Sequence, residues 1–238
     1  MLHARLTRLR GALQRGVARL AAPSIVRRVS ADALTYLEPA ALRDLYDVVR
    51  AAGRERVPGV LIEVGCALGG SALVMAAART REYPLQLYDV FGMPPAPTAG
   101  DGPDAHGRYA EIASGRSPGI GGGVYYGYVE HLLEQVRATF ARYGFDPDRD
   151  RIEFIQGMVQ DMLPSTGPVA VAHVDCDRYA SVRTCLERIA PRLSPRGVLV
   201  VDDYEHKSGC RRAVDEYFRG REAEYRFVHR SRLHITRM

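Results

Sequence analysis

The sequence is poor in cysteine and in long apolar runs, and each shortage excludes a class of protein. Its four cysteines form no C-x-x-C pair and no paired spacing, so we expect neither a disulfide framework nor a cysteine zinc site. A reducing cytoplasm is the expected location. No apolar run approaches the roughly 18 to 20 residues that a transmembrane helix requires, so no transmembrane segment is expected.

Positive charge is concentrated at the beginning of the chain. The net charge is +5, but residues 1–30 hold seven arginines and no acidic residue, which leaves 26 basic and 28 acidic residues in 31–238. This near-neutral remainder, without a basic aromatic track, argues against a nucleic-acid partner. Residues 1–30 also space leucine and valine at helical intervals, which indicates a basic amphipathic N-terminal arm. The arm lies either on a membrane surface or against its own domain or a second subunit.

The rest of the chain alternates between helical and strand patterns. With 46% hydrophobic residues, the chain suits one α/β domain over 31–238 with this arm appended. Ser30 is typical of an N-cap and predicts a helix over 31–52. Nearly continuous apolar strands separated by helices favour a mostly parallel sheet covered on both faces, and so a doubly wound α/β fold. The predicted strands are 59–65, 84–90, 151–156, 169–175 and 197–203, with a helix over about 178–193.

A segment rich in glycine and proline interrupts this alternation. Residues 92–123 contain 14 Gly or Pro among 32 residues and no apolar period, so we expect a loop without helix or strand. Because it follows the second strand, at the edge where α/β sheets bind ligands, we interpret 92–127 as a lid rather than inert disorder. Tyr125, Tyr126 and Tyr128 open a predicted helix that runs to about Tyr143. They either wall an acceptor pocket or are ordinary packing residues.

A glycine loop follows the first strand, where nucleotide-type cofactors bind. The run E-V-G-C-A-L-G-G, from Glu63 to Gly70, is not the G-x-G-x-x-G of dinucleotide enzymes, because an acid precedes its first glycine. An acid suits an ammonium group and free N–H groups suit a carboxylate, so a ligand with an amino-acid end and a nucleoside fits: S-adenosylmethionine. Asp89 ends the next strand, where a carboxylate accepts hydrogen bonds from ribose. The expected cofactor contacts are Glu63, Gly65, Ala67, Gly69, Ser71, Asp89, Gly157 and Asp175.

Paired aspartates end two later strands. The first strand ends in His173-Val174-Asp175-Cys176-Asp177, and the next ends in Asp202-Asp203-Tyr204. Four carboxylates at one sheet edge repel one another unless a cation lies between them. Oxygen ligands without a cysteine or histidine cluster favour Mg²⁺ over zinc. The alternative is that these aspartates merely cap the helix after Asp177 and a later turn.

Four runs of the sequence are E-V-G-C-A-L-G-G (63–70), D-V-F-G-M-P (89–94), H-V-D-C-D-R-Y-A-S (173–181) and L-S-P-R-G-V-L-V-V-D-D-Y (193–204). Together they resemble the macrocin O-methyltransferase family. The resemblance implies an S-adenosylmethionine- and Mg²⁺-dependent enzyme that methylates sugar hydroxyls, with a seven-stranded class I methyltransferase fold, often as a homodimer. It also implies metal binding by Asp175, Asp202 and Asp203, with Asp177 near the reacting hydroxyl. Where the family commonly has D-x-F-E-G, this chain has Gly92 in place of the glutamate, so it lacks that cofactor contact.

The expected reaction is methyl transfer to a sugar hydroxyl. A divalent cation stabilises the alkoxide and a carboxylate takes the proton. We expect Asp175 as metal ligand and base-side group, Asp177 as the alternative base, and His173 or His206 as further candidates. The acceptor is a small-molecule glycoside or an oligo- or polysaccharide, and catechol-like phenols are also open. Two other functions remain: a metal-dependent glycosyltransferase that uses the D-x-D at 175–177, and a cofactor-binding partner subunit without catalysis.

Overall fold

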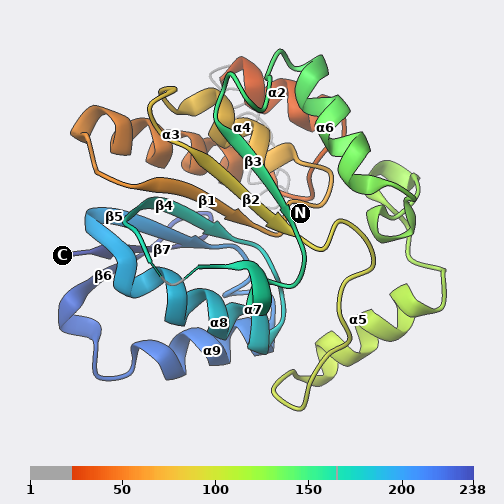
Figure 1. The fold of residues 1–238 in the computed structure, drawn as a ribbon. Helices are drawn as coiled ribbons and strands as arrows, with labels where there is room; N and C mark the ends of the chain where they lie inside the picture. The colour runs from red at the N-terminus through yellow and green to blue at the C-terminus, as the bar shows by residue number, and fades with distance from the viewer. Residues whose placement is uncertain (1–22, 165) are drawn as a thin grey trace, which may run out of the picture.

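The protein is built around one mixed, mostly parallel β-sheet (Figure 1). The computed structural model describes residues 23–164 and 166–238, so most of the predicted basic arm lies outside the described residues. Within them, a seven-stranded sheet has the order β3-β2-β1-β4-β5-β7-β6; β7 pairs antiparallel with β5 and β6, and the other neighbouring strands pair parallel. The predicted doubly wound fold is confirmed. The strands are β1 (Val60–Val64), β2 (Leu85–Asp89), β3 (Ile152–Gln156), β4 (Val169–Val174), β5 (Leu193–Val201), β6 (Tyr225–His229) and β7 (Leu233–Arg237).

Helices cover both faces of the sheet (Figure 1). One face carries α2 (Ser24–Ala31), α3 (Pro39–Glu55), α4 (Gly70–Ala78) and α6 (Leu132–Arg142); the other carries α7 (Val159–Met162), α8 (Tyr179–Ile189) and α9 (Ser208–Phe218). Strand alternation divides the core, because Leu61 packs with the first group while Ile62 and Val64 pack with the second. Each such buried side chain contributes about 1.5–3 kcal/mol relative to an exposed one. No helix among the described residues is long and apolar enough to cross a membrane.

The predicted start of the helix over 31–52 is wrong. Ser30 does not cap a helix but lies inside α2, and the next helix, α3, begins at Pro39. Proline suits the first turn of a helix, while it keeps the residue before it, Glu38, extended. Val26 and Val29 of α2 are buried in the core, so the boundary expected after residue 30 falls within a helix that packs on the domain.

The prediction that residues 92–123 lack helix and strand is also partly wrong. This segment contains α5 (Pro103–Ala113) and the 3₁₀ turn η1 (Ile120–Gly122). The helix expected from Tyr125 begins only at Leu132, after a second 3₁₀ turn, η2 (Tyr126–Tyr128). Contacts distant in sequence hold α5. Asp101 Oδ1 accepts the N–H of Tyr179 at 2.7 Å, and Asp104 Oδ2 accepts the N–H of Ser208 at 3.1 Å. Figure 1 shows α5 set apart from the sheet. Besides these two bonds, Arg178 Nη1 donates to the Ala105 carbonyl oxygen at 3.1 Å, and Ser208 Oγ donates to Asp104 Oδ1.

Candidate active site

A cavity of about 400 Å³ opens at the carboxyl ends of the parallel strands, beside the point between β1 and β4 where the strand order reverses. The volume suits a small-molecule site. The glycine loop, the end of β2 and the aspartate pairs line it, and so do the segment before α3 and the lid. Its lining includes Tyr36, Leu37, Gly65, Ala67, Asp89, Tyr125, Tyr126, Asp175, Asp177, Asp202, Asp203, His206, Lys207 and Arg232.

Asp89 shapes the glycine loop as well as lining the cavity. Its Oδ2 accepts the backbone N–H groups of Cys66 at 2.6 Å and Ala67 at 3.0 Å, and its Oδ1 accepts that of Phe91 at 2.7 Å. Burial raises the pKa of Asp89, and these hydrogen bonds partly oppose the rise. Gly65 has φ +91°, and a Cβ atom there would lie 1.8 Å from the carbonyl oxygen of Asp175. The glycine therefore lets the loop touch the end of β4.

The structure does not bring Glu63 to the cavity. Its side chain is wholly buried, Ser71 Oγ donates to Oε1, and His173 Nδ1 lies 3.0 Å from Oε2. Glu63 and His173 are paired in register on β1 and β4, so alternation sends both to the same face of the sheet. The expected ammonium contact of Glu63 and a catalytic role of His173 therefore find no support in this geometry.

Half of the expected cofactor contacts line the cavity: Gly65, Ala67, Asp89 and Asp175. The other half lie outside its lining: Glu63, Gly69, Ser71 and Gly157. Gly69 is the N-cap of α4 with φ +87°, and Gly157 donates its N–H to the Asp89 carbonyl oxygen at 2.9 Å. These glycines support the loop and the end of β2 through the backbone.

Three aspartates converge in the cavity. Asp175, Asp177 and Asp203 present oxygens that all lie within 4.8 Å of one another. Burial and the charges of Asp177 and Asp175 raise the pKa of Asp203 to about 11, and its buried Oδ2 has no hydrogen-bond partner among the described residues. Burial and Asp202 raise the pKa of Asp175 well above its usual range. Lys207 Nζ lies 3.7 Å from Asp177 Oδ2. This cluster of negative charge fits a hard cation.

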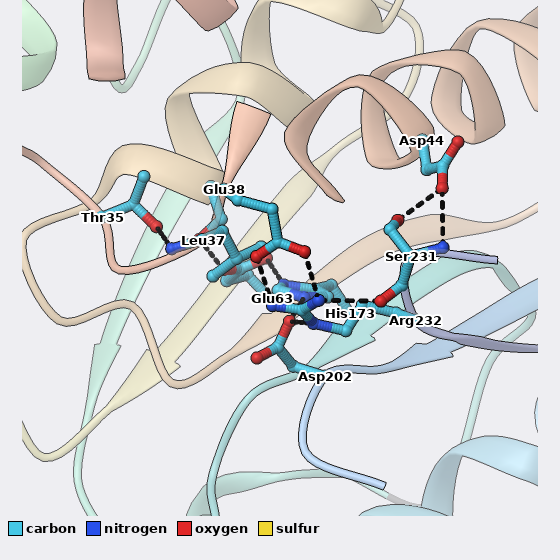
Figure 2. A network of polar contacts seen from close by, with 10 residues as sticks. Thr35, Leu37, Glu38, Asp44, Glu63, His173, Asp202, Ser231 and Arg232 are labelled. Carbon is cyan, nitrogen blue, oxygen red and sulfur yellow. Dashed lines mark hydrogen bonds and ion pairs between the residues drawn. The ribbon is translucent and has the colours of Figure 1, made fainter. Parts of the chain in front are cut away.

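Asp202 lies apart from this cluster, which differs from the expected ligand set of Asp175, Asp202 and Asp203. Its Oδ1 accepts a hydrogen bond from Arg232 Nε and lies 3.9 Å from His173 Nε2 (Figure 2). Burial raises the pKa of Asp202, but His173 and Arg232 lower it further than burial raises it. Successive residues at a strand end point to opposite sides, so Asp203 turns toward Asp177 while Asp202 turns toward His173.

Sequence reasoning missed Arg232 and Glu38. Arg232 Nη1 and Nη2 donate to the two carboxylate oxygens of Glu38 at 2.7 and 3.0 Å. Neither residue belongs to a motif, and they are 194 positions apart in the chain. The signal would have been the antiparallel pairing of β7 with β5, which brings Arg232 beside Asp202.

Tyrosines from the lid form part of the cavity wall. Tyr125 and Tyr126 line the cavity with ring centroids 4.4 Å apart, and Tyr36 lies 6.4 Å from Tyr126. Tyr128 does not line it; its hydroxyl donates to the carbonyl oxygen of Ile112 at 2.5 Å and so contacts α5. Two of the three tyrosines thus occupy the predicted wall and the third is a packing residue.

Comparisons of sequence bear on this geometry. The family model Macrocin-O-methyltransferase (TylF) matches residues 26–226. An 8-demethyl-8-(2,3-dimethoxy-alpha-L-rhamnosyl)-tetracenomycin-C 4'-O-methyltransferase of Streptomyces olivaceus is 36% identical over 187 residues, 76% of this chain and 65% of that protein. A Mycinamicin III 3''-O-methyltransferase of Micromonospora griseorubida is 31% identical over 187 residues, 74% of this chain and 66% of that protein. The alignments span just under two thirds of these relatives' own length.

Solved methyltransferase structures superpose on this chain. The O-methyltransferase NovP superposes with a TM-score of 0.70 at 26% identity, over 86% of this chain and 82% of that one. CalS11, a calicheamicin methyltransferase, gives 0.55 at 18% identity, over 83% and 77%, which shows a shared fold. Because the family model covers residues 26–226, and with them both the glycine loop and the aspartate pairs, this chain belongs to the macrocin O-methyltransferase (TylF) family.

Proposed function

We propose that the protein transfers a methyl group from S-adenosylmethionine to a hydroxyl of a sugar, on a glycoside or an oligosaccharide, with a divalent cation such as Mg²⁺. One observation carries the proposal: a single cavity joins the glycine loop and Asp89 to the cluster of Asp175, Asp177 and Asp203. The relatives are named for methylation of sugar positions, which supports a sugar acceptor. The proposal includes a homodimer in a reducing cytoplasm, as the resemblance and the unpaired cysteines imply.

The donor part of the cavity is the glycine loop. Gly65 and Ala67 bring backbone to the cavity surface, and Asp89 adds a carboxylate whose remaining acceptor site suits a ribose hydroxyl. When bound, S-adenosylmethionine supplies a methyl group on a positively charged sulfur. The carboxyl groups of Asp89 and Asp175 line the same cavity.

The unpartnered Oδ2 of Asp203 and its raised pKa support a divalent cation in the cluster, because among the described residues Lys207 is paired only with Asp177. Asp175 and Asp203 would hold the ion. An ion held there would supply a Lewis acid that lowers the pKa of the acceptor hydroxyl. Asp177 would take the proton from that hydroxyl, because its side chain is 44% exposed whereas Asp203 is 7% exposed. His206 lines the cavity, and we assign it no proton transfer.

The acceptor part lies beside the lid. Tyr125 and Tyr126 offer aromatic surface on which the C–H face of a sugar ring can pack. The tethers of α5 to Tyr179 and Ser208 hold the lid against the body of the protein. A lid held in this way would exclude water and help to align the acceptor hydroxyl with the donor.

The test is mass spectrometry of a panel of glycosides and oligosaccharides incubated with the protein and S-adenosylmethionine, with Mg²⁺ or with EDTA. We expect a mass gain of one methylene that EDTA and Asp175→Asn abolish. Asp161→Asn, which changes an exposed aspartate of α7, is the matched control and should retain activity. Full turnover in EDTA would contradict the metal mechanism. Family membership leaves the glycosyltransferase alternative without support.

A further inference from the structure

Arg232 bridges two carboxylates that belong to different parts of the site (Figure 2). Its side chain is 9% exposed, and the residue directly precedes β7 in the chain. Its two terminal nitrogens hold Glu38, just before α3, while Nε holds Asp202, just after β5. A planar guanidinium provides these three donors at once, which a lysine ammonium does not match in geometry.

Glu38 belongs to the segment that covers the glycine loop, residues 32–38, here called the cap segment. The N–H of Gly70, at the start of α4, donates to the Leu34 carbonyl oxygen at 3.1 Å. A Cβ atom on Gly70 would lie 2.5 Å from that same oxygen, so the cap segment rests directly on the first turn of α4. Tyr36 and Leu37 line the cavity. The position of Glu38 therefore affects the donor end of the cavity.

Asp202 belongs to the acidic end of the cavity. It immediately precedes Asp203, and its charge is one of the causes that raise the pKa values of Asp203 and Asp175. Beyond Asp202, the contacts pass through buried His173 and Glu63 to Ser71 in the first turn of α4. The buried chain is interrupted between Asp202 and His173, whose Nε2 has no hydrogen-bond partner among the described residues, so Arg232 is the continuous connection between the two ends of the cavity.

We propose that Arg232 is a positioning residue that couples cation binding at the acidic cluster to donor binding under the cap segment. The inference rests on the proposed function, since it needs both ligands. Fixing the Asp202 carboxylate also fixes Arg232, and Arg232 then holds Glu38 and the cap segment over the glycine loop. Binding of either ligand therefore lowers the entropy cost of ordering the cap segment and Asp202 when the other ligand binds. Each ligand must change the affinity of the other by the same factor.

The test is calorimetry on the full chain with S-adenosylhomocysteine and MnCl₂, each titrated with and without a saturating amount of the other. In the wild-type protein we expect each ligand to tighten the other by about fivefold or more, the lower end of typical coupling. Glu38→Gln should remove this mutual effect while both ligands still bind, because Glu38 is 51% exposed and its loss leaves Arg232 on Asp202. Arg232→Gln should remove it too, and Arg232→Lys should restore it only in part.

Arg237→Gln is the matched control. It breaks an arginine–glutamate pair, Arg237 Nη1 to Glu224 Oε2 at 2.8 Å, at the far end of β7 from Arg232 and outside the cavity, so coupling should persist. Full coupling in Glu38→Gln, or loss of coupling in Arg237→Gln alone, overturns the inference. If both ligands bind the wild-type protein without affecting each other, the inference fails and the proposed function stands. If neither binds, the proposed function fails and the inference falls with it.

Discussion

Replacing Gly65 by alanine tests whether the glycine loop must touch the end of β4. The new Cβ atom would lie 1.8 Å from the Asp175 carbonyl oxygen, and real Cβ atoms essentially never approach closer than 3.0 Å, so the loop and β4 must separate by about 1.2 Å. Overpacking of this kind costs about 1–3 kcal/mol. The left-handed φ of +91° adds strain of about 1–3 kcal/mol. Together these lower the free energy of unfolding by about 2–6 kcal/mol.

Gly144→Ala is the control that separates the two costs. Gly144 has φ +86° but nothing within 4 Å of the added Cβ atom, so it carries the strain without the overpacking. We expect urea unfolding to show a loss about 1–3 kcal/mol larger for Gly65→Ala than for Gly144→Ala. Calorimetry with S-adenosylhomocysteine should show at least about tenfold weaker binding for Gly65→Ala, as expected for about 1.4 kcal/mol, and no change for Gly144→Ala. Equal stability losses together with wild-type ligand affinity in Gly65→Ala would refute the reasoning.

Three further predictions concern the acidic cluster and the lid. Losing a residue that supports a metal ligand without touching the metal weakens metal binding about 10- to 100-fold. In calorimetry with MnCl₂, Asp203→Asn should weaken Mn²⁺ binding by more than this, and Asp202→Asn should stay within this range. The reverse order would return Asp202 to the ligand set. The pKa of Asp203 is about 11 in the folded protein but near 4 unfolded, so the folded chain binds more protons between these values. In EDTA the free energy of unfolding should therefore fall as the pH rises from about 6 to about 9, and urea unfolding of Asp203→Asn should show a smaller slope. Tyr125→Leu should raise the KM for the glycoside about 2- to 12-fold, the equivalent of 0.5–1.5 kcal/mol of aromatic contact, in steady-state assays that leave the affinity for S-adenosylhomocysteine unchanged.

Local patterns predicted the fold and the place of the site. Apolar strands alternating with helices bring their carboxyl ends to one edge, which placed Asp89, Asp175 and Asp203 in one cavity. The direction of a side chain at a strand end was harder to predict. The carboxylates of Glu63 and Asp202 turn away from the expected direction because each has a buried polar partner: His173 for Glu63 and Arg232 for Asp202.

Contacts between distant segments were not visible in the sequence. The glycine- and proline-rich lid has no apolar period, yet α5 forms because Asp101 and Asp104 bind the backbone at the starts of α8 and α9. Likewise, no motif announces Arg232, since its partners come from the other end of the chain and from β5. Propensity alone underestimates elements that tertiary contacts stabilise.

The antiparallel strand β7 has a consequence for how the protein is made. Because β7 lies between β5 and β6, residues 233–237 must be synthesised before the sheet is complete. Until then, a nascent chain presents the unpaired backbone of β5, flanked by the apolar side chains of Leu199 and Val201, as an open edge. A copy that stops before residue 225 would keep that edge permanently and would be prone to aggregate, even though its glycine loop and all four aspartates are present.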